Sequence, residues 1–491
     1  MGCVIGIDVG SQSVKAVVAD DQGRALATAS APCTMHHPAA GWAEQDPADW
    51  TTALIAAVRR ARTDAGLCRD DITMLGLACQ VDGLVALDAQ LRPVRPAIIW
   101  LDRRATDQSA ALADAVGEPE LVGRTGLNPD ASHVAPKAMW LRDVEPANYA
   151  ATRWLASAGA HMNGWLTGEV VHDHAHASST LLYDLRARAW SDDLVGHAGL
   201  DAARLPAIRP AAAVLGTLRA EVADALGLSR HCRVIVGTGD DHAGALGAGA
   251  LAPGVIVDVT GTAEPVAVPS REAVLDDERM IETHAHAVEE MLLVENPGFV
   301  SGGSTRWWAA TQGIPQAELF GLAALAPPGS DGAVFLPTLS GSTAPRWNGR
   351  MRGCFAGLAL SHDAAHLARA VLEGCAYALR DIVDRFAALG LAGDEIRVVG
   401  GGARSALWLQ IKADVTNRPV RAVLGECATS AGAAMLAAVA DGAFGDLGEA
   451  AAASVELAAE PVLPRAEHRG VYDDSYGAYR RLFDGVEGAL A

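Results

Sequence analysis

Residues 3–30 read CVIGIDVGSQSVKAVVADDQGRALATAS, and the alternation in this stretch predicts how the chain begins to fold. β-Branched residues run up to Val9, Gly10 interrupts them, and they resume at Val14, which is typical of two strands joined by a glycine turn. A following Asp-Gln-Gly turn predicts a third strand. A related pattern, VIVDVTGTAEPVAVPS, occupies residues 255–270. We therefore expect two domains of one architecture, each opening with a glycine-turned hairpin.

The sequence between and after these hairpins alternates between helix and strand patterns. Asp46-Pro47 predicts a helix start, because aspartate caps helices and proline is favoured in the first turn. MLGLAC at residues 74–79 predicts a buried strand, and RVVGGGARSALWLQIKADV at residues 397–415 predicts a strand, a glycine loop and a helix. Residues 472–490 predict a closing amphipathic helix. This alternation predicts an α/β fold.

Length, charge and cysteine spacing limit the classes of protein to consider. The 491 residues exceed one hydrophobic core, so we expect domains over residues 1–243 and 244–491. With 59 acidic and 39 basic residues the net charge is −20, which disfavours nucleic acid and anionic membranes as partners. The eight cysteines form no CxxC pair, and the opening MGCVIGIDVG lacks the features of a signal peptide. We expect a cytoplasmic protein and leave a homodimer open.

The turn of the first hairpin has the composition of a phosphate-binding loop. Gly10 would let an anion approach the backbone N–H groups. Asp8, just before the turn, could hold Mg²⁺ directly or through water. The alternative is an ordinary hairpin that needs glycine at its turn, but two matched hairpins facing each other across a cleft would favour a phosphate site. The side chains available to phosphate are those of Ser11, Gln12, Ser13 and Lys15.

A third glycine cluster, Gly400-Gly401-Gly402, lies between a predicted strand and a predicted helix. A nucleotide could lie flat against such a backbone, with the helix N-terminus favouring negative charge. The spacing does not fit GxGxxG, which disfavours a dinucleotide. An ordinary strand-to-helix turn is the alternative.

The stretch VGTGDDHAGALGAGAL at residues 236–251 places Asp240 and Asp241 before a run of very small residues. One aspartate could serve as the helix N-cap, but that role does not explain both. The small residues suit close packing at a domain boundary. A carboxylate at that boundary could accept the proton of a substrate hydroxyl while its oxygen attacks phosphorus.

Several segments resemble the FGGY family of carbohydrate kinases, most closely its xylulokinase branch. GIDVGSQSVKAVV and VDVTGTAEPV resemble the two phosphate loops, and GGGARSALWLQIKADVTNRPV resembles the adenosine loop. GCFAGLALSHDAAHLARAVLEG, at residues 353–374, reproduces the C-terminal signature G-x-F-x-G-L, seven residues, then H-L-x-x-A-V-L-E. The resemblance implies two RNase-H-like domains of the actin, hexokinase and Hsp70 ATPase type that flank a nucleotide cleft. It also implies an ATP- and Mg²⁺-dependent sugar kinase.

The resemblance assigns roles to individual residues. Asp240 matches the general base, and Asp8 matches the carboxylate that holds Mg²⁺. The expected nucleotide contacts are Gly10, Ser11, Gln12, Ser13, Lys15, Thr260, Gly261, Thr262, Gly401, Gly402 and Ala403. The expected sugar contacts are Val81, Asp82, Trp100, Asp102 and Asp241.

Two departures from the xylulokinase pattern bear on the substrate. Gln80-Val81-Asp82-Gly83 stands where that branch typically has Gln-Met-His-Gly, and Asp241 stands where it typically has asparagine. Both changes place carboxylates at expected sugar contacts, which favours a neutral polyhydroxyl ligand over a sugar acid. The expected acceptor is a small neutral ketose, a pentulose such as D-xylulose. D-ribulose or a polyol such as erythritol is the alternative.

Two further hypotheses remain. His172, His174 and His176 alternate, so a strand would place three imidazoles on one face with metal-ligand spacing, whereas the alternative is a polar stretch near the sugar site. An Hsp70-like or actin-like ATPase switch without sugar turnover is the rival from another class. The C-terminal signature favours the kinase over this switch, and the intact Asp8 and Asp240 argue against a kinase-like regulator that binds sugar without turnover.

Overall fold

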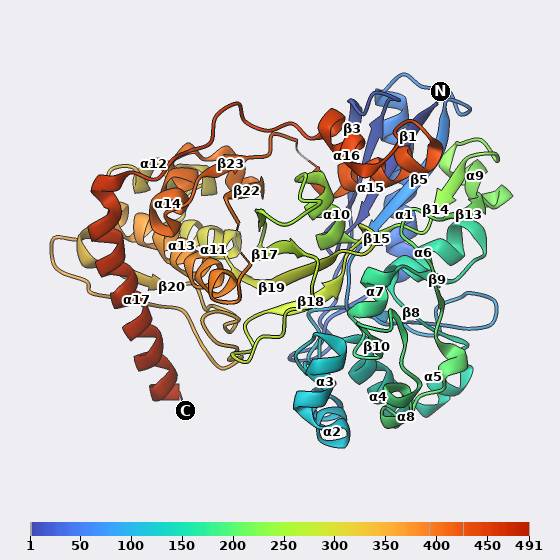
Figure 1. Cartoon of the computed structure of the whole chain (residues 1–491), viewed down its shortest axis with the longest axis horizontal. Helices are drawn as coiled ribbons and strands as arrows, with labels where there is room; N and C mark the ends of the chain where they lie inside the picture. The colour runs from blue at the N-terminus through green and yellow to red at the C-terminus, as the bar shows by residue number, and fades with distance from the viewer. Residues whose placement is uncertain (1, 392, 426, 491) are drawn as a thin grey trace.

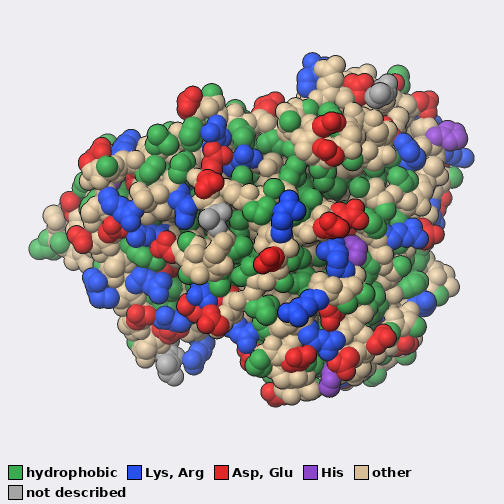
Figure 2. Space-filling view, viewed as in Figure 1, with side chains coloured by type: hydrophobic (Ala, Val, Ile, Leu, Met, Phe, Trp, Pro, Cys, Tyr) green, Lys and Arg blue, Asp and Glu red, His purple; other side chains and the backbone are tan. Residues whose placement is uncertain are grey.

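The computed structural model describes residues 2–391, 393–425 and 427–490. Two lobes, each built around a β-sheet with helices packed against it, lie side by side (Figure 1). The predicted α/β class is therefore confirmed. Acidic and basic side chains are interspersed over both lobes on the face shown in Figure 2.

The first sheet has the strand order β13-β14-β5-β1-β2-β3, with β15 paired to β5. β2 runs antiparallel to both of its neighbours, β1 and β3, whereas β5 runs parallel to both β1 and β14. The bounds are β1 (Cys3–Val9), β2 (Ser13–Ala19), β3 (Ala25–Pro32), β5 (Ile72–Cys79), β13 (Val214–Thr217), β14 (Arg233–Ile235) and β15 (Thr238–Gly239).

The second sheet has the order β18-β19-β17-β16-β22-β23. Its strands β19, β17, β16, β22 and β23 repeat the order and directions of β3, β2, β1, β5 and β14. This repetition confirms two RNase-H-like sheets, each opening with a glycine-turned hairpin. The bounds are β16 (Val255–Thr260), β17 (Ala263–Ser270), β18 (Glu282–Ala285), β19 (Leu292–Val300), β22 (Glu395–Gly400) and β23 (Val420–Ala422). The predicted boundary at residue 243 remains a prediction.

The remaining elements are helices, short strand pairs and 3₁₀ turns. The helices are α1 (Pro47–Asp64), α2 (Thr106–Val116), α3 (Glu118–Thr125), α4 (Val134–Val144), α5 (Pro146–Ala151), α6 (Ala158–Thr167), α7 (His174–Ser178), α8 (Asp192–His197), α9 (Ala220–Leu226), α10 (Asp240–Gly247), α11 (Gly302–Gln312), α12 (Gln316–Ala323), α13 (Ala364–Ala388), α14 (Ala406–Thr416), α15 (Ala428–Asp441), α16 (Leu447–Ser454) and α17 (Arg469–Leu490). The short strand pairs are β4 (Glu44–Gln45) with β7 (Ala97–Ile98), β6 (Val85–Leu87) with β8 (Trp154–Ala156), β9 (Val171–His172) with β12 (Ala207–Ile208), β10 (Tyr183–Asp184) with β11 (Ala189–Trp190), and β20 (Val334–Leu336) with β21 (Cys354–Ala356). The 3₁₀ turns are Ala202–Arg204, Ser330–Gly332, Gly401–Arg404 and Ala466–His468. In the part of the chain that the structure describes, every helix is too short or too polar to cross a lipid bilayer.

The two faces of β1 pack against different partners, as the two-residue period of a strand requires. Ile5, Ile7 and Val9 join the core that contains α1, whose predicted N-cap Asp46 accepts a hydrogen bond from Ala48 N. Val4, on the opposite face, joins a cluster that includes residues of α15. Thus a helix from the C-terminal half of the chain covers one face of the N-terminal sheet.

The contact of α15 with α10 and the first sheet is so close that backbone touches backbone. A Cβ added to Gly6 would lie 1.9 Å from the carbonyl oxygen of Ser430, and one added to Gly76 would lie 2.3 Å from that of Ala433. Between the helices, a Cβ on Gly432 would lie 2.0 Å from the Ala243 oxygen. Only glycine fits at such separations, which explains the run of small residues that follows the paired aspartates.

We predict that Gly432→Ala destabilises the protein, whereas Gly485→Ala does not. Alanine normally favours a helix over glycine by about 1 kcal/mol, and nothing lies within 4 Å of a Cβ at Gly485 on α17. At Gly432 the new methyl group must displace backbone, which costs roughly 1–3 kcal/mol. Urea unfolding midpoints should therefore move in opposite directions, and equal midpoints for the two variants would contradict the close helix contact.

Candidate active site

The first hairpin brings a carboxylate and an ammonium group together at its mouth. Asp8 on β1 lies opposite Lys15 on β2, and Lys15 Nζ lies 3.3 Å from Asp8 Oδ2. Burial raises the pKa of the Asp8 carboxyl, and the Lys15 charge opposes that rise. The Asp8 charge in turn raises the pKa of Lys15, so that side chain is a cation at neutral pH.

The second hairpin faces the first across the junction of the lobes. Gln12 Nε2, in the turn of the first hairpin, lies 3.4 Å from Thr262 Oγ1 in the turn of the second. Gly302 N and Gly303 N, at the start of α11, donate to the carbonyl oxygens of Gly261 and Thr262. The two turns expected to bind phosphate are thus brought together, although they lie 250 residues apart.

The third glycine cluster lies directly behind the second hairpin. Gly400 has φ +87°, which favours glycine, and a Cβ on Gly402 would lie 2.6 Å from Thr260 Cγ2. A Cβ on Gly401 would by contrast be tolerated, since its nearest neighbour would be the Thr260 oxygen at 3.9 Å. Residues 401–404 form a 3₁₀ turn that leads into α14, so backbone N–H groups and a helix start lie together here.

A buried lysine that the sequence reasoning missed joins these two loops. Lys412 Nζ on α14 donates to Asp258 Oδ2 at 2.5 Å, Thr260 Oγ1 at 2.7 Å and Glu264 Oε1 at 3.0 Å. Burial lowers the pKa of Lys412, but the charges of Asp258 and Glu264 outweigh it and raise the value overall. A lysine among apolar positions of a predicted helix was the available signal, because such a residue needs a partner.

The two adjacent aspartates occupy the first turn of α10 at the junction of the lobes (Figure 1). Neither is the N-cap, because Gly239 holds that position, so the capping interpretation is wrong. Burial, together with the charges of Asp241 and Asp8, raises the pKa of Asp240 well above its ordinary value. Burial, followed by the charges of Asp82 and Asp8, raises the pKa of Asp241 to about 6. Carboxyl groups with raised pKa values are candidates for general acid–base roles.

The loop after β5 reaches the acid pair. Val81 packs against the residue before Asp240, since a Cβ on Gly239 would lie 2.6 Å from Val81 Cγ1. Asp82 has φ +61°, and its backbone oxygen accepts a hydrogen bond from the buried Lys137 Nζ. The predicted sugar residues Val81, Asp82 and Asp241 are therefore brought together.

The other two predicted sugar residues behave differently. Asp102 is fully buried, and its carboxylate accepts hydrogen bonds from Ala43 N and from the backbone and guanidinium of Arg104. These four bonds use both carboxylate oxygens and hold Arg104 in place, and the contact of Asp102 with sugar remains a prediction. Trp100 lies half-buried in a turn after β7, and its contact with sugar remains a prediction.

The alternating histidines do not form a strand face. β9 ends at His172 and α7 begins at His174, because the Asp173 carboxylate caps α7 through His176 N. The expectation of one imidazole face is therefore wrong, and among residues 2–391, 393–425 and 427–490 no group of three His, Cys, Asp or Glu side chains could hold a metal. Asp173 instead accepts from Thr238 Oγ1 at 2.7 Å, two residues before Asp240.

Asp8 alone could still help to hold a divalent metal. Mg²⁺ is usually held by one or two carboxylates together with phosphate oxygens and water, and does not need an all-protein cage. Asp8 supplies a buried carboxylate beside the first phosphate loop, and Asp240 is close enough to raise the pKa of Lys15 through its charge. The oxygen donors therefore fit that mode of binding.

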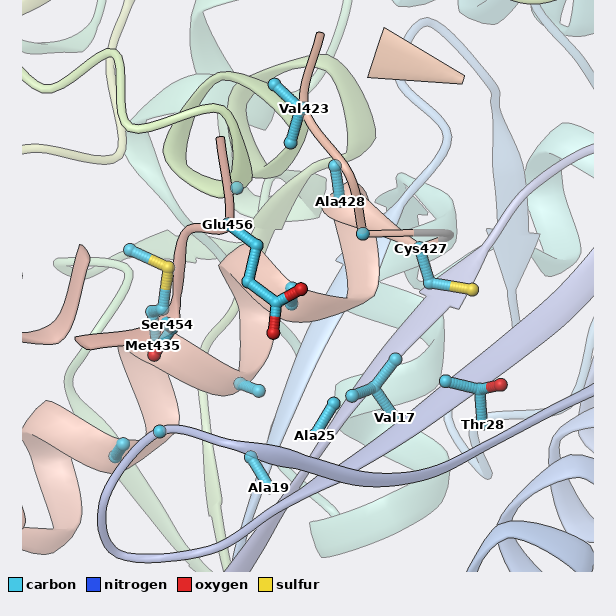
Figure 3. Close-up of a pocket in the computed structure, with 16 residues that line it drawn as sticks. Val17, Ala19, Ala25, Thr28, Val423, Cys427, Ala428, Met435, Ser454 and Glu456 are labelled. Carbon is cyan, nitrogen blue, oxygen red and sulfur yellow. The ribbon is translucent and has the colours of Figure 1, made fainter. Parts of the chain in front are cut away.

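A cavity of about 120 Å³ lies apart from these residues, between the β2–β3 strands and α15 (Figure 3). Figure 3 shows Val17 and Ala25 on one side, with Glu456 and Cys427 on the other. The residues that line the cavity include none of the predicted contacts, so this space belongs to the packing between lobes rather than to the site.

Comparison with known proteins follows the same division of the chain. Residues 3–247 match the model of the FGGY family of carbohydrate kinases, N-terminal domain, and residues 259–440 match that family's C-terminal domain. The chain is 30% identical to a xylulose kinase of Escherichia coli (strain K12), over 98% of each chain. It is 32% identical to a glycerol kinase of Citrifermentans bemidjiense, over 96% of this chain and 97% of that one. The crystal structure of xylulose kinase from Rhodospirillum rubrum superposes with a TM-score of 0.89 at 31% identity, over 99% of each chain.

We predict that Asp241→Asn stabilises the protein without ligand more at pH 8 than at pH 5. The folded pKa of Asp241, about 6, exceeds that of an unfolded aspartate, so ionisation costs stability that accumulates as pH rises from the unfolded value to about 6 and is fully present above it. Removing the charge should gain about 1 kcal/mol more at pH 8 than at pH 5. Urea midpoints at both pH values measure this difference. The exposed Asp474 provides the control, since Asp474→Asn should shift neither midpoint, and a pH-independent gain for Asp241→Asn would contradict the raised pKa of Asp241.

Proposed function

The chain belongs to the FGGY family of carbohydrate kinases and is an ATP-dependent sugar kinase, and on that premise we propose that its acceptor is a small neutral ketose, a pentulose such as D-xylulose. The phosphoryl group goes to a terminal hydroxyl of that acceptor. Several similar proteins and solved structures are named as xylulose kinases, which supports this choice over the glycerol of the other relative.

The observation that carries the proposal is the meeting of both hairpins with the acid pair at one junction. Gln12 and Thr262 bring the two phosphate loops to within 3.4 Å, and the Asp240 and Lys15 charges are close enough to influence each other. A nucleotide phosphate placed between the loops would lie beside the carboxylate that takes the proton.

In the proposed reaction Asp240 is the general base. The acceptor hydroxyl gives its proton to the Asp240 carboxylate as its oxygen forms a bond to the γ-phosphorus, and the bond from that phosphorus to the ADP oxygen breaks. Its raised pKa makes Asp240 a stronger base than an exposed aspartate once it is ionised. Lys15 would balance negative charge on the transferred group.

The family uses ATP and typically a divalent metal, which we propose is Mg²⁺ held by Asp8. When bound, the metal neutralises phosphate charge. The chain's own part is to present a carboxylate at the end of β1, where Lys15 and the Gly10 turn meet. For the nucleotide itself we propose Gly10, Ser11, Gln12, Ser13, Lys15, Thr260, Gly261, Thr262, Gly401, Gly402 and Ala403.

Asp82 and Asp241 support a neutral acceptor, since carboxylates accept hydrogen bonds from hydroxyls and repel acids. Val81 would supply an apolar contact against Gly239. D-ribulose or a polyol such as erythritol remains the alternative acceptor. An ATPase switch of the same fold is not favoured, because the whole chain matches sugar kinases.

We predict that Asp240→Asn folds normally and loses nearly all turnover. The amide cannot accept the proton, and loss of a general base typically costs about 10²–10⁴-fold in rate. Coupled ADP release should show this loss in kcat with the KM for ATP changed less than about threefold. Retention of more than a tenth of the wild-type kcat would reassign the base.

We predict that D-xylulose or another pentulose gives the highest kcat/KM in a substrate panel. The panel comprises D-xylulose, D-ribulose, L-xylulose, L-ribulose, erythritol, glycerol and the pentitols, each measured by coupled ADP release. Preference for a polyol over every ketose would refute the acceptor proposed here.

A further inference from the structure

A continuous row of ionisable side chains runs from the predicted sugar loop into the second lobe. His133 Nδ1 lies 3.0 Å from Asp82 Oδ1, and His133 Nε2 lies 3.7 Å from Glu282 Oε1. His284 Nε2 then lies 3.9 Å from Glu282 Oε2 and 3.2 Å from Glu295 Oε1. The sequence reasoning identified none of the four residues beyond Asp82.

The strands that carry this row are fixed to the first lobe. Asn128 N donates to Glu282 Oε1 at 2.9 Å, and Thr283 N donates to the Gly126 oxygen at 2.9 Å. Ala285 N donates to Ser178 Oγ at 3.0 Å. β18 and β19 therefore form a wall on the first lobe's side of the junction, although they belong to the second sheet.

This wall leaves buried polar atoms without hydrogen-bond partners. Glu295 Oε2 has none, nor do both ring nitrogens of His242, which follows Asp241 directly. His284 touches Glu295 but lacks hydrogen-bond geometry to it, and its ring lies 5.8 Å from the His242 ring. Orphaned buried polar atoms are costly, about 1–3 kcal/mol each, so a ligand or water is expected to satisfy them.

The charge around Glu295 favours its neutral form. It is 4% exposed, and burial followed by the charges of Asp241, Glu282, Asp82 and Asp240 raises its pKa well above the ordinary value. The neighbouring His284 does not compensate, since burial lowers the pKa of that imidazole and keeps it neutral. Several carboxylates in one low-dielectric region cannot all ionise. A protonated carboxyl donates a hydrogen bond, which an ionised one cannot do.

His133 places a positive charge beside Asp82. Both His133 nitrogens face only acceptors, namely Asp82 Oδ1 and the Ser179 oxygen on one side and the Asn128 oxygen on the other. An imidazole in that setting carries both protons. Its positive charge supports the Asp82 carboxylate as an acceptor for sugar hydroxyls.

We propose that Glu295, a residue of the second lobe, donates a hydrogen bond to the carbonyl oxygen of the acceptor and so selects a ketose over the corresponding polyol. This inference rests on the proposed function and specifies its substrate class. A ketose carbonyl needs a donor, and Asp82 stands where the xylulokinase branch typically has a histidine that could supply one. Glu295 restores that donor from the opposite wall of the site.

The test compares Glu295→Gln, which keeps a donor of similar shape, with Glu295→Leu, which removes it. D-xylulose is the ketose probe, and xylitol, with a hydroxyl in place of the C2 carbonyl, is the polyol probe, measured as substrate or competitive inhibitor. Glu295→Leu should lower kcat/KM for D-xylulose by about 10–100-fold, mainly through KM, because a site built around a hydrogen bond discriminates strongly when it is lost. Glu295→Gln should stay within about threefold of wild type.

Two readouts separate this role from simple loss of structure. In Glu295→Leu the KM for ATP should change less than about threefold, and so should the KM or inhibition constant of xylitol. Neither quantity depends on a hydrogen-bond donor to a carbonyl. Glu289→Leu, an exposed site on the same β18–β19 hairpin, should leave all constants unchanged. Glu295→Leu also removes the cost of burying the unsatisfied Glu295 Oε2, so the leucine variant is expected to fold.

Three results would overturn the inference. The first is unchanged D-xylulose kinetics in Glu295→Leu. The second is that this variant weakens D-xylulose and xylitol by the same factor. The third is that its KM for ATP rises by the same factor as its KM for D-xylulose. The wild-type assay separates this failure from that of the proposed function. If the wild type turns over D-xylulose and Glu295→Leu does so equally well, only the role of Glu295 is refuted. A wild type inactive on every ketose removes both proposals.

Discussion

The close approach of α15 to α10 and to β1 and β5 is the constraint on which the rest of the structure depends. Gly6 lies two residues before Asp8, and Gly247 lies in the helix whose first turn carries Asp240; a Cβ at either would lie 1.9 Å from a backbone oxygen of residues 428–430. The same helix therefore fixes the strand that presents one carboxylate and the helix that presents the other. Bulk at these glycines would change the separation of Asp8 from Asp240.

Cationic side chains then join parts of the site that lie far apart in the sequence. Lys15 pairs with Asp8 at the first hairpin, and Lys412 ties the second hairpin to the adenosine loop. His133 connects the sugar loop to a strand of the second lobe. Each of these groups is stabilised by carboxylates that would be costly if unpaired, so charge balance and loop position are set together.

The sequence predicted those features whose signals are local. Glycine turns and β-branched runs located both hairpins, and Asp46-Pro47 located α1, because a few neighbouring residues determine these elements. Local competition explains one difference, since Asp173 caps α7 and interrupts the histidine alternation. The partners of Lys412 lie about 150 residues distant, and the charges of Asp82, Asp240 and Asp241 act on Glu295 from the first lobe, so composition alone could not identify either residue. The family resemblance, rather than periodicity, assigned Asp240 its role.

The position of α15 also constrains how the chain matures on the ribosome. Val4, Gly6 and Gly76 lie on a face of the first sheet that α15 (Ala428–Asp441) covers closely. Roughly 350 residues separate the end of β5 from that helix, and at ~5–20 residues per second their translation takes about 20–70 s. During that interval a nascent first lobe displays an uncovered apolar face. A messenger RNA truncated before codon 428 would therefore yield an aggregation-prone fragment instead of an independent N-terminal domain.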